Sequence, residues 1–576
     1  MRFPIRPALL LALSFVVPAQ AQLPLKPPAH AVASAHPLAT EAGMQILQAG
    51  GNAFDAAVAV SAALAVVEPT GSGLGGGGFW LTHRQFDNLD LVIDGREVAP
   101  IAATGDMYLL RNGESDRWLS RDGPLSAAIP GEPAALVHIS RTMGNLPLAQ
   151  ALAPAIRYAR DGFIVDSKLA GAIARHQHRL SPAAAAIFAP QGQPLPEGAT
   201  LRQPDLALTL ERLASGGLNG FYGGRTAELL LAGVKNDGGI WGDQDLKRYR
   251  IIERKPLVFH WRGHRIVAPP PPSAGGVALI QSLKMLDKLG WPTADATLNQ
   301  HFVVEALRRV YRDRAEFLGD PAFTDIPMQR LLSDAYLARL AHGVSRHAAT
   351  PSNSLPTPGN RELREHGDTS HLSVLDAEGN YVAATLSINL PFGSGYMPPG
   401  SGVLLNDEMD DFSTQPLAPN AYGLLGSKAN GIRPGKRMLS SMTPTLMDSE
   451  DGLLIIGTPG GSRIITMVLL GILEYVQGAS ATEIVAAPRF HHQYLPDEIS
   501  YESGAISEDG AWKLVGMGHH LRQLPFRYGN MQVVYWDKRE GRVEAASDPR
   551  GVGGVLVVGA EAAPEPARNN NTRATR

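Results

Sequence analysis

The sequence predicts a layered protein that combines α-helices with β-strands. Its 576 residues, of which 44% are hydrophobic and 19% charged, have the composition of a soluble globular protein. Residues 303–318 carry apolar side chains at helical spacing, and residues 372–386 form two apolar runs around a turn. The length allows either several average domains or one layered core, and no fixed-period repeat indicates a solenoid or propeller.

The N-terminus predicts export. Arg2 and Arg6 precede an apolar run at 8–17, and residues 18–21 (PAQA) match the small-x-small pattern of a secretory signal. The run is half the roughly 20 residues that a membrane-spanning helix needs. We therefore expect cleavage after Ala21 and a mature protein that is periplasmic or secreted, with no membrane partner.

Composition excludes several kinds of chemistry. The chain has no cysteine, which removes disulfides, thiol catalysis and thiolate metal ligands. Its 52 basic and 55 acidic side chains give a net charge of -3 without a basic stripe, so nucleic acid is not an expected partner.

The first third alternates helix, loop and strand. Residues 40–67 predict a helical stretch broken at Gly50-Gly51, and residues 79–82 and 89–94 predict strands. The glycine-rich segment 71–78 lies between them. It lacks the Lys-Ser/Thr ending of a phosphate-binding loop, so tight turns and close backbone approach are the preferred interpretation.

The remaining elements are predicted with less detail. Residues 130–290 predict a helical scaffold, and the helix at 303–318 has charged residues between its apolar positions. A polar loop is expected at 348–367. Residues 453–456 predict a strand that a turn connects to a helix at 462–475, and the tail after about 560 is expected to be disordered.

Familiar hydrolase signatures are absent from the sequence. It contains no G-x-S-x-G, S-x-x-K or H-E-x-x-H motif. His491 and His492, with Asp497 and Glu498 nearby, are a weak metal candidate, because adjacent strand residues point to opposite faces. No metal is expected.

The hairpin at 372–386 brings two hydroxyl side chains together. If its turn is 376–380, Thr369 faces Ser387, and directly opposed residues have Cβ atoms roughly 4.5–5.5 Å apart. Asn389 lies two residues further and is expected on the same face. Taken alone, the pair is more typical of a solvated strand face than of a catalytic site.

Longer motifs then give the chain a family resemblance. It resembles the γ-glutamyltranspeptidases over nearly all of its length after the signal, including the glycine-rich loop and residues 94–97 and 311–321. The segments that carry the resemblance are 369–374 (TSHLSV), 392–413 (FGSGYMPPGSGVLLNDEMDDFS), 436–445 (KRMLSSMTPT), 457–466 (GTPGGSRIIT) and 488–498 (PRFHHQYLPDE).

The resemblance implies a fold and a maturation step. Members of this family fold as a four-layered αββα sandwich of the N-terminal-nucleophile hydrolase type, an α/β (α+β) architecture. They are made as precursors that cleave themselves. The matching cut lies between Asp368 and Thr369 and would leave a large chain, 22–368, and a small chain, 369–576, associated as a heterodimer. Cleavage would free an amino group of pKa about 7.7–8.0, which can serve as the base for the Thr369 hydroxyl.

The resemblance also implies roles for individual residues. Thr369 is the nucleophile, and Ser387 hydrogen-bonds to it where the family has threonine; Ser370 likewise replaces a threonine. The amides of Gly460 and Gly461 form the oxyanion hole. The residues expected to bind the amino-acid head group of the substrate are Arg96, Asn389, Glu408, Asp411, Ser440 and Ser441. Without the resemblance, Arg96 beside Glu97 would be interpreted as a surface ion pair. Asp410-Asp411 would be interpreted as a solvated acidic turn. Residues 413–437, with Tyr422, resemble a lid over the site.

The implied function is a γ-glutamyl hydrolase and transpeptidase that acts on glutathione and related compounds, with amino acids or peptides as acceptors. It needs no metal or organic cofactor. Two alternatives stay open. One is a cephalosporin or glutaryl acylase on the same scaffold, and the other is an exported binding protein without catalysis.

Overall fold

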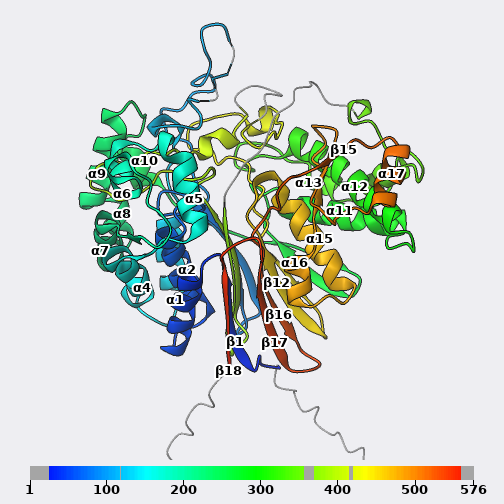
Figure 1. The fold of residues 1–576 in the computed structure, drawn as a ribbon, viewed down its shortest axis with the longest axis horizontal. Coiled ribbons are helices and arrows are strands. Elements are labelled where there is room, and N and C mark those ends of the chain that lie inside the picture. The colour runs from blue at the N-terminus through cyan, green and yellow to red at the C-terminus, as the bar shows by residue number, and fades with distance from the viewer. Residues whose placement is uncertain (1–24, 114, 117, 356–368, 414–419, 560–576) are drawn as a thin grey trace, which may run out of the picture.

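The computed structural model describes residues 25–113, 115–116, 118–355, 369–413 and 420–559. Two β-sheets pack face to face at its centre, and helices cover the outer face of each (Figure 1). This is the αββα sandwich that the family resemblance implies, so the predicted fold class is confirmed. The predicted signal, residues 1–21, and the predicted tail lie outside the described residues.

The first sheet has seven strands, and every neighbouring pair is antiparallel. The β9–β10 hairpin lies inside this sheet, between two strands from the first hundred residues. In spatial order the strands are β18 (Gly554–Gly559), β1 (Ala29–Ser34), β9 (Ser370–Leu375), β10 (Tyr381–Ser387), β2 (Gly77–Arg84), β3 (Leu89–Asp94) and β6 (Ile252–Arg254).

The second sheet has six antiparallel strands. They are β17 (Arg542–Ser547), β16 (Gln532–Asp537), β12 (Gly452–Gly457), β11 (Thr445–Asp448), β8 (His264–Ala268) and β7 (Leu257–Trp261). The expectation of a helical scaffold over 130–290 misses β6, β7 and β8. In β7, Phe259 and Trp261 are buried and His260 is exposed, a period-two pattern that is too short to stand out in the sequence.

Helices form the two outer layers. On the side of the first sheet (Figure 1) these are α1 (Pro37–Gln48), α2 (Ala53–Val67), α3 (Glu132–Thr142), α4 (Leu148–Asp161), α5 (Ser167–His176), α6 (Pro182–Phe188), α7 (Pro204–Gly216), α8 (Leu218–Tyr222), α9 (Gly224–Asn236) and α10 (Asp243–Arg248). On the other side are α11 (Gly275–Leu289), α12 (Ala296–Phe317), α13 (Met328–Leu331), α14 (Asp334–His342), α15 (Ile464–Val476), α16 (Ala481–Ala486) and α17 (Glu508–Gly516). In the described ranges no helix is both long enough and apolar enough to span a membrane.

Two small sheets complete the structure. They consist of β4 (Phe163–Ile164) with β5 (Thr200–Leu201), and of β13 (Phe490–His491), β14 (Ile499–Tyr501) and β15 (Leu521–Gln523). The first helix begins at Pro37, three residues before the predicted start, because proline suits the first turn and the His36 ring accepts the Leu38 amide.

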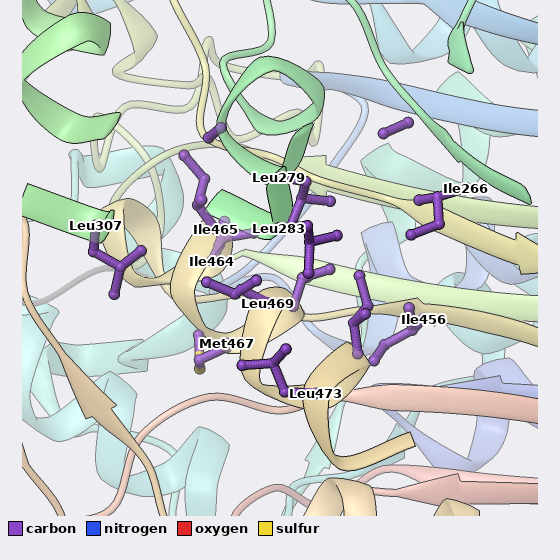
Figure 2. Close-up of a cluster of buried hydrophobic side chains, with 14 of the residues drawn as sticks. Ile266, Leu279, Leu283, Leu307, Ile456, Ile464, Ile465, Met467, Leu469 and Leu473 are labelled. Carbon is purple, nitrogen blue, oxygen red and sulfur yellow. The ribbon is translucent and has the colours of Figure 1, made fainter. Parts of the chain in front are cut away.

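Apolar side chains of α11 and α15 fill the space outside the second sheet. Figure 2 shows them converging on β8 and β12; the labelled contributors include Ile266, Leu279, Leu283, Ile456, Leu469 and Leu473. Helix α15 is apolar on almost every face, which matches its burial between the sheet and its neighbours. The position of α15 matters because the turn that leads into it carries the two glycines of the predicted oxyanion hole.

Charged residues on α12 are buried rather than solvated. Glu305 pairs with Arg308 at 3.2 Å and with Arg309 at 2.6 Å, and Asp313 accepts a hydrogen bond from Gln281 at 2.9 Å. The predicted helix is confirmed. Its polar side, however, faces other parts of the protein, because helices and loops cover this helix.

The hairpin register agrees with the prediction. Leu386 pairs with Ser370, so extending the ladder by one residue places Thr369 opposite Ser387. The Asp376 carboxylate accepts the Asn380 amide at 2.9 Å, which closes the five-residue turn.

The strand order bears on the predicted chain cleavage. A cut before Thr369 would leave β9 and β10 in the small chain, hydrogen-bonded on either side to β1 and β2 of the large chain. The second sheet would likewise contain strands of both chains. Separating the two chains would therefore require breaking both sheets.

The glycine-rich segment makes the close backbone approach predicted for it. A Cβ at Gly76 would lie 2.1 Å from the Ser387 carbonyl oxygen. The Gly76 carbonyl in turn accepts the amides of Gly131 and Glu132, at 2.8 and 3.0 Å, which fixes the start of α3. Only a residue without a side chain fits between these two segments.

Glu132 is expected to make stability depend on pH. Its side chain is fully buried, and neither carboxyl oxygen has a hydrogen-bond partner of normal geometry among the described residues. Burial raises the pKa of Glu132 to about 8, and the nearby Gly73 amide lowers it only in part. The folded protein therefore holds a proton that the unfolded chain releases near pH 4.5, and stability is lost as the pH rises toward 8.

Glu132→Gln removes this titration. We expect the melting temperature of the variant, relative to the unmodified protein, to rise between pH 5 and pH 8, by an amount equivalent to a few kcal/mol (about 1.4 kcal/mol per pKa unit). Thermal unfolding at matched scan rates measures this difference. A constant difference across that range would show that Glu132 is not protonated in the folded protein.

Candidate active site

Thr369 and Ser387 lie at the same end of the central hairpin and face one small cavity. Thr369 is 4% exposed and Ser387 5%, so neither is on a solvated strand face. The Ser387 hydroxyl oxygen accepts the Asn389 amide at 2.8 Å, which leaves its proton for another acceptor.

Nine of the ten predicted site residues line this cavity. Its volume is about 20 Å³, which is space for roughly one water molecule. The lining residues are Arg96, Thr369, Ser387, Asn389, Glu408, Asp411, Tyr422, Leu424, Ser440, Ser441, Met442, Gly461 and Ile464. Gly460 lines a larger cavity on the other side of the same turn. The site is thus a small, partly open cavity with a mostly polar lining.

Asn389 reaches the cavity by a route other than the predicted one. Strand β10 ends at Ser387, and Asn389 has a left-handed backbone with φ of 76°. Its side-chain amide donates to the Asp407 carbonyl at 3.0 Å. The turn, rather than strand alternation, directs this residue into the site.

Arg96 is the centre of a buried ion-pair network. Its guanidinium contacts Glu408 and Asp411, each at 2.5 Å, and Glu97 at 3.3 Å. The Asp94 carboxylate, at the end of β3, accepts the Arg96 amide at 2.9 Å and so fixes the turn that carries the arginine. Arg96 is 1% exposed. Taken alone, these residues favour a surface ion pair and a solvated acidic turn. Both interpretations are wrong, because the side chains are buried and paired with one another.

A second guanidinium belongs to this network. Arg314 of α12 donates to the Ser441 hydroxyl at 3.1 Å and is 5% exposed. This role is not visible in the sequence, because Arg314 lies near the end of a helix whose charged positions match an ordinary polar face. Burial lowers the pKa of Arg314, and the attraction of Asp411 opposes this effect.

Burial and mutual repulsion control the carboxyl groups. Burial, followed by the charge of Glu408, raises the pKa of Glu97 well above its ordinary value. The same two causes raise the pKa of Asp411 to about 7, against the attraction of Arg96 and Arg314. Desolvation opposes the charge of Arg96, but Glu408, Glu97 and Asp411 outweigh it and raise the pKa of the guanidinium. At neutral pH the guanidinium groups of Arg96 and Arg314 therefore lie beside an Asp411 carboxyl group that is only partly ionised.

The Gly460-Gly461 turn supplies amides at the other end of the cavity. Both glycines have positive φ, 138° and 55°, and a Cβ at Gly461 would lie 2.4 Å from the Tyr422 ring. The turn leads through a short 3-10 helix, Gly461–Arg463, into α15. Backbone N–H groups at such a helix start stabilise negative charge, as an oxyanion hole requires.

Tyr422 closes the cavity. Its hydroxyl donates to the Asn389 carbonyl at 2.8 Å, and its own carbonyl accepts from Gln493 at 3.1 Å. Asn420 links it to the head-group network, since it accepts the Tyr422 amide at 3.0 Å and donates to Asp411 at 2.9 Å. Residues 414–419 of the predicted lid lie outside the described ranges.

The second residue of the predicted small chain is anchored separately. The Ser370 hydroxyl donates to Glu68 at 2.5 Å, on the opposite side of β9 from the cavity. Glu68 ends α2 and also pairs with Lys168 at 3.4 Å. Glu68 is a further residue that the sequence did not identify.

The weak metal candidate does not assemble. The His491 ring contacts Thr466 and Gln493, at 2.8 and 3.0 Å, and His492 contacts Asp497 at 3.2 Å. These two rings thus use different partners.

A second group brings His301, Glu305 and His519 together in the described structure. The two imidazoles are hydrogen-bonded to each other at 2.7 Å, and Glu305 is paired with two arginines. These contacts explain the cluster as internal pairing, and the adjacent guanidinium groups oppose a bound cation.

Comparisons with known protein sequences match one family over most of the chain. The γ-glutamyltranspeptidase family model matches residues 39–558. The glutathione hydrolase proenzyme of Escherichia coli (strain K12) is 41% identical over 532 residues, 90% of each chain. That of Pseudomonas aeruginosa is 41% identical over 92% of this chain and 94% of its own.

Solved structures with a similar fold include an acylase and a transpeptidase. A cephalosporin acylase from Bacillus halodurans superposes with a TM-score of 0.81 at 26% identity, covering 95% of this chain and 99% of its own. The γ-glutamyltranspeptidase of Helicobacter pylori has a TM-score of 0.54 at 36% identity, covering 58% of this chain and 96% of that structure's chain.

Proposed function

This chain belongs to the γ-glutamyltranspeptidase family and is an enzyme of that family, and from this premise we propose that it hydrolyses and transfers the γ-glutamyl group of glutathione and related compounds. The observation that carries the proposal is the cavity itself. It holds a hydroxyl nucleophile, an amide turn and a head-group site of paired charges within one buried chamber.

The proposed maturation creates the catalytic base. The Thr369 hydroxyl attacks the Asp368 carbonyl, the peptide bond opens to an ester, and water releases Asp368 as a carboxylate. Asp368 lies outside the described residues. The freed Thr369 amino group can then accept a proton near neutral pH, which a threonine hydroxyl needs in order to act as a nucleophile. The products are the chains 22–368 and 369–576, held as a heterodimer by the shared sheets.

The proposed turnover uses the same hydroxyl. Thr369 Oγ attacks the γ-glutamyl carbonyl, its proton passes to the Thr369 amino group, and the Gly460 and Gly461 amides stabilise the developing oxyanion. Ser387 hydrogen-bonds to the nucleophile. The amine leaves with the proton, and water or an acceptor amine then cleaves the threonyl ester. No step requires a metal or an organic cofactor.

Charge balance favours an amino-acid head group over a glutaryl group. An α-amino acid is a neutral zwitterion, so Arg96 can exchange its protein partners for the substrate carboxylate while Glu408 and Asp411 take the ammonium. A glutaryl group brings a negative charge into this buried site but no ammonium for Glu408 and Asp411 to bind. The acylase alternative rests on the similarity to the Bacillus halodurans structure.

One experiment tests processing, export and donor together. We expect two bands on a denaturing gel, with N-termini at Gln22 and Thr369, and turnover of glutathione at least about tenfold faster than that of a glutaryl-cephalosporin. Faster glutaryl turnover would support the acylase. One uncut band that binds ligand without turnover would support the binding protein. The subcellular fraction that contains the two chains tests the proposed periplasmic or secreted location.

A further inference from the structure

Glu68, in the predicted large chain, lies against the first residues of the predicted small chain. It ends α2, is 7% exposed, and its carboxylate accepts the Ser370 hydroxyl at 2.5 Å. Thr369, the proposed nucleophile, directly precedes Ser370. Glu68 therefore reaches the nucleophile through the neighbouring residue of the strand.

The β-ladder is incomplete at this end of β9. On the β10 side the pairing continues to Ser370, which lies opposite Leu386. On the β1 side it stops at Leu372, which lies opposite Ser34. The hydroxyl bond to Glu68 is thus an additional attachment at the point where only one neighbouring strand still holds the chain.

The turn that follows Glu68 packs against the same two residues. The Glu68 carbonyl accepts the amides of Gly71 and Ser72, at 3.0 and 3.4 Å. A Cβ at Gly71 would lie 2.8 Å from the Ser370 hydroxyl oxygen and 3.2 Å from the Thr369 carbonyl. This close contact fixes the position of the carboxylate relative to the start of β9.

The proposed cleavage would make Thr369 a chain end. Chain ends fray unless other contacts tie them down, and a catalytic group must be held within about 0.5 Å of its productive position. The new amino group would also be positively charged when it is protonated. Partly buried charges interact across roughly 8 Å or more, so a carboxylate bonded to the next residue favours the protonated form.

Other charged groups act on this amino group as well. Lys168 of α5 pairs with the Glu68 carboxylate at 3.4 Å and offsets part of its charge. His371, on β9 itself, stays neutral because burial lowers the pKa of its ring to about 3. On the cavity side of Thr369 the charged residues are Arg96, Glu408 and Asp411.

We propose that Glu68 is a positioning residue for the Thr369 nucleophile, which it holds through the Ser370 hydroxyl, and that its charge sets the pH at which the freed amino group becomes a base. The inference rests on the proposed function, because that amino group exists only after cleavage. Without the Glu68 charge the amino group would lose its proton at a lower pH. Without Lys168 it would lose its proton at a higher pH.

Two variants separate the hydrogen bond from the charge. Ser370→Ala removes the bond and keeps the carboxylate, so kcat for hydrolysis of a γ-glutamyl anilide should fall about fivefold or more, with the donor KM changed less than about twofold. Glu68→Gln keeps an acceptor oxygen and removes the charge. The acidic limb of its kcat profile should move about half a pH unit or more toward lower pH.

Lys168→Gln should move the same limb in the opposite direction. Glu228→Gln makes the same chemical change as Glu68→Gln in an exposed ion pair on α9, and it should leave both kcat and the limb unchanged. All variants are compared as the processed fraction, so that a defect in cleavage does not enter kcat. A role in folding alone would lower the yield or kcat without moving the limb.

Unchanged limbs in both Glu68→Gln and Lys168→Gln would overturn the role of the charge, and an unchanged kcat in Ser370→Ala would overturn the positioning role. If Glu68→Gln yields no processed enzyme, the shift in Lys168→Gln decides. If the unmodified enzyme does not cleave the anilide, the proposed function fails separately. NMR titration of the N-terminal threonine in the processed protein then decides: a lower midpoint in Glu68→Gln supports the inference, and identical midpoints contradict it.

Discussion

Thr369→Ala should leave the chain uncut and lower γ-glutamyl anilide turnover by at least about 10⁴-fold, the scale seen when a hydrolase loses its nucleophile. The same hydroxyl is needed twice, first to open the bond before residue 369 and then to form the acyl-enzyme. A denaturing gel and intact mass measure the first effect, and initial rates measure the second. Both effects should appear together, because a single atom causes them.

Two neighbouring substitutions serve as controls for this prediction. Thr369→Ser keeps a hydroxyl and should still be cleaved, at a reduced rate. Ser370→Ala removes the adjacent hydroxyl, which is bonded to Glu68 on the other side of the strand, and should also be cleaved. Cleavage and turnover by Thr369→Ala would show that another residue is the nucleophile.

The sequence predicts this part of the site well because it is local. The hairpin register follows from a turn in which Asp376 accepts a hydrogen bond from Asn380. Once this turn is set, each residue of β9 has a fixed partner on β10. The diglycine turn is equally local, since positive φ and the lack of space at Gly461 both restrict the position to glycine. The resemblance then assigned roles that spacing alone left open.

The head-group network could not be derived in this way. Arg96 and Asp411 are 315 residues apart in sequence, and only the packing of two loops brings them together. Arg314 adds a charge from a helix of the other layer. An amphipathic pattern assigns such side chains to solvent, because it cannot show that another element covers the polar face.

The buried charges on α12 and the missed strands have a related cause. Three-residue and five-residue strands such as β6 and β7 carry too few alternating positions to stand out from a helical background. Strand β6 pairs with β3, and the hairpin of β7 and β8 is joined to the sheet through β11, so both depend on strands that are distant in sequence. Such tertiary contacts are not visible in a local pattern.

Arg96→Met should have the second largest effect, a loss of about 10²- to 10⁴-fold in kcat/KM for γ-glutamyl donors. Removing one member of a buried ion pair typically costs about 3–5 kcal/mol, and each 1.4 kcal/mol is a factor of ten. Methionine keeps most of the volume but cannot bind the donor carboxylate. Kinetics on the processed fraction measure this loss, and Arg225→Met, an exposed substitution on α9, controls for the loss of one positive charge.

The same substitution should also make the protein sensitive to alkaline pH. Without Arg96 the pKa of Asp411, already about 7, rises further, because the charge that opposes burial and Glu408 is removed. A carboxyl group whose folded pKa lies above its unfolded value contributes stability at low pH and loses it as the pH rises through the folded pKa. The melting temperature of Arg96→Met should therefore approach that of the unmodified protein at pH 5 and fall well below it at pH 8.

Combining the kinetic and thermal measurements separates binding from folding. If Arg96 only neutralised its neighbours, Arg96→Met would lose stability at pH 8 but keep its donor KM at pH 5, where Asp411 is closer to neutral. If Arg96 binds the donor carboxylate, the KM stays high at both pH values, since protonating Asp411 restores no cation. A donor KM that returns to normal at pH 5 would remove Arg96 from the substrate site and leave it a role in folding alone.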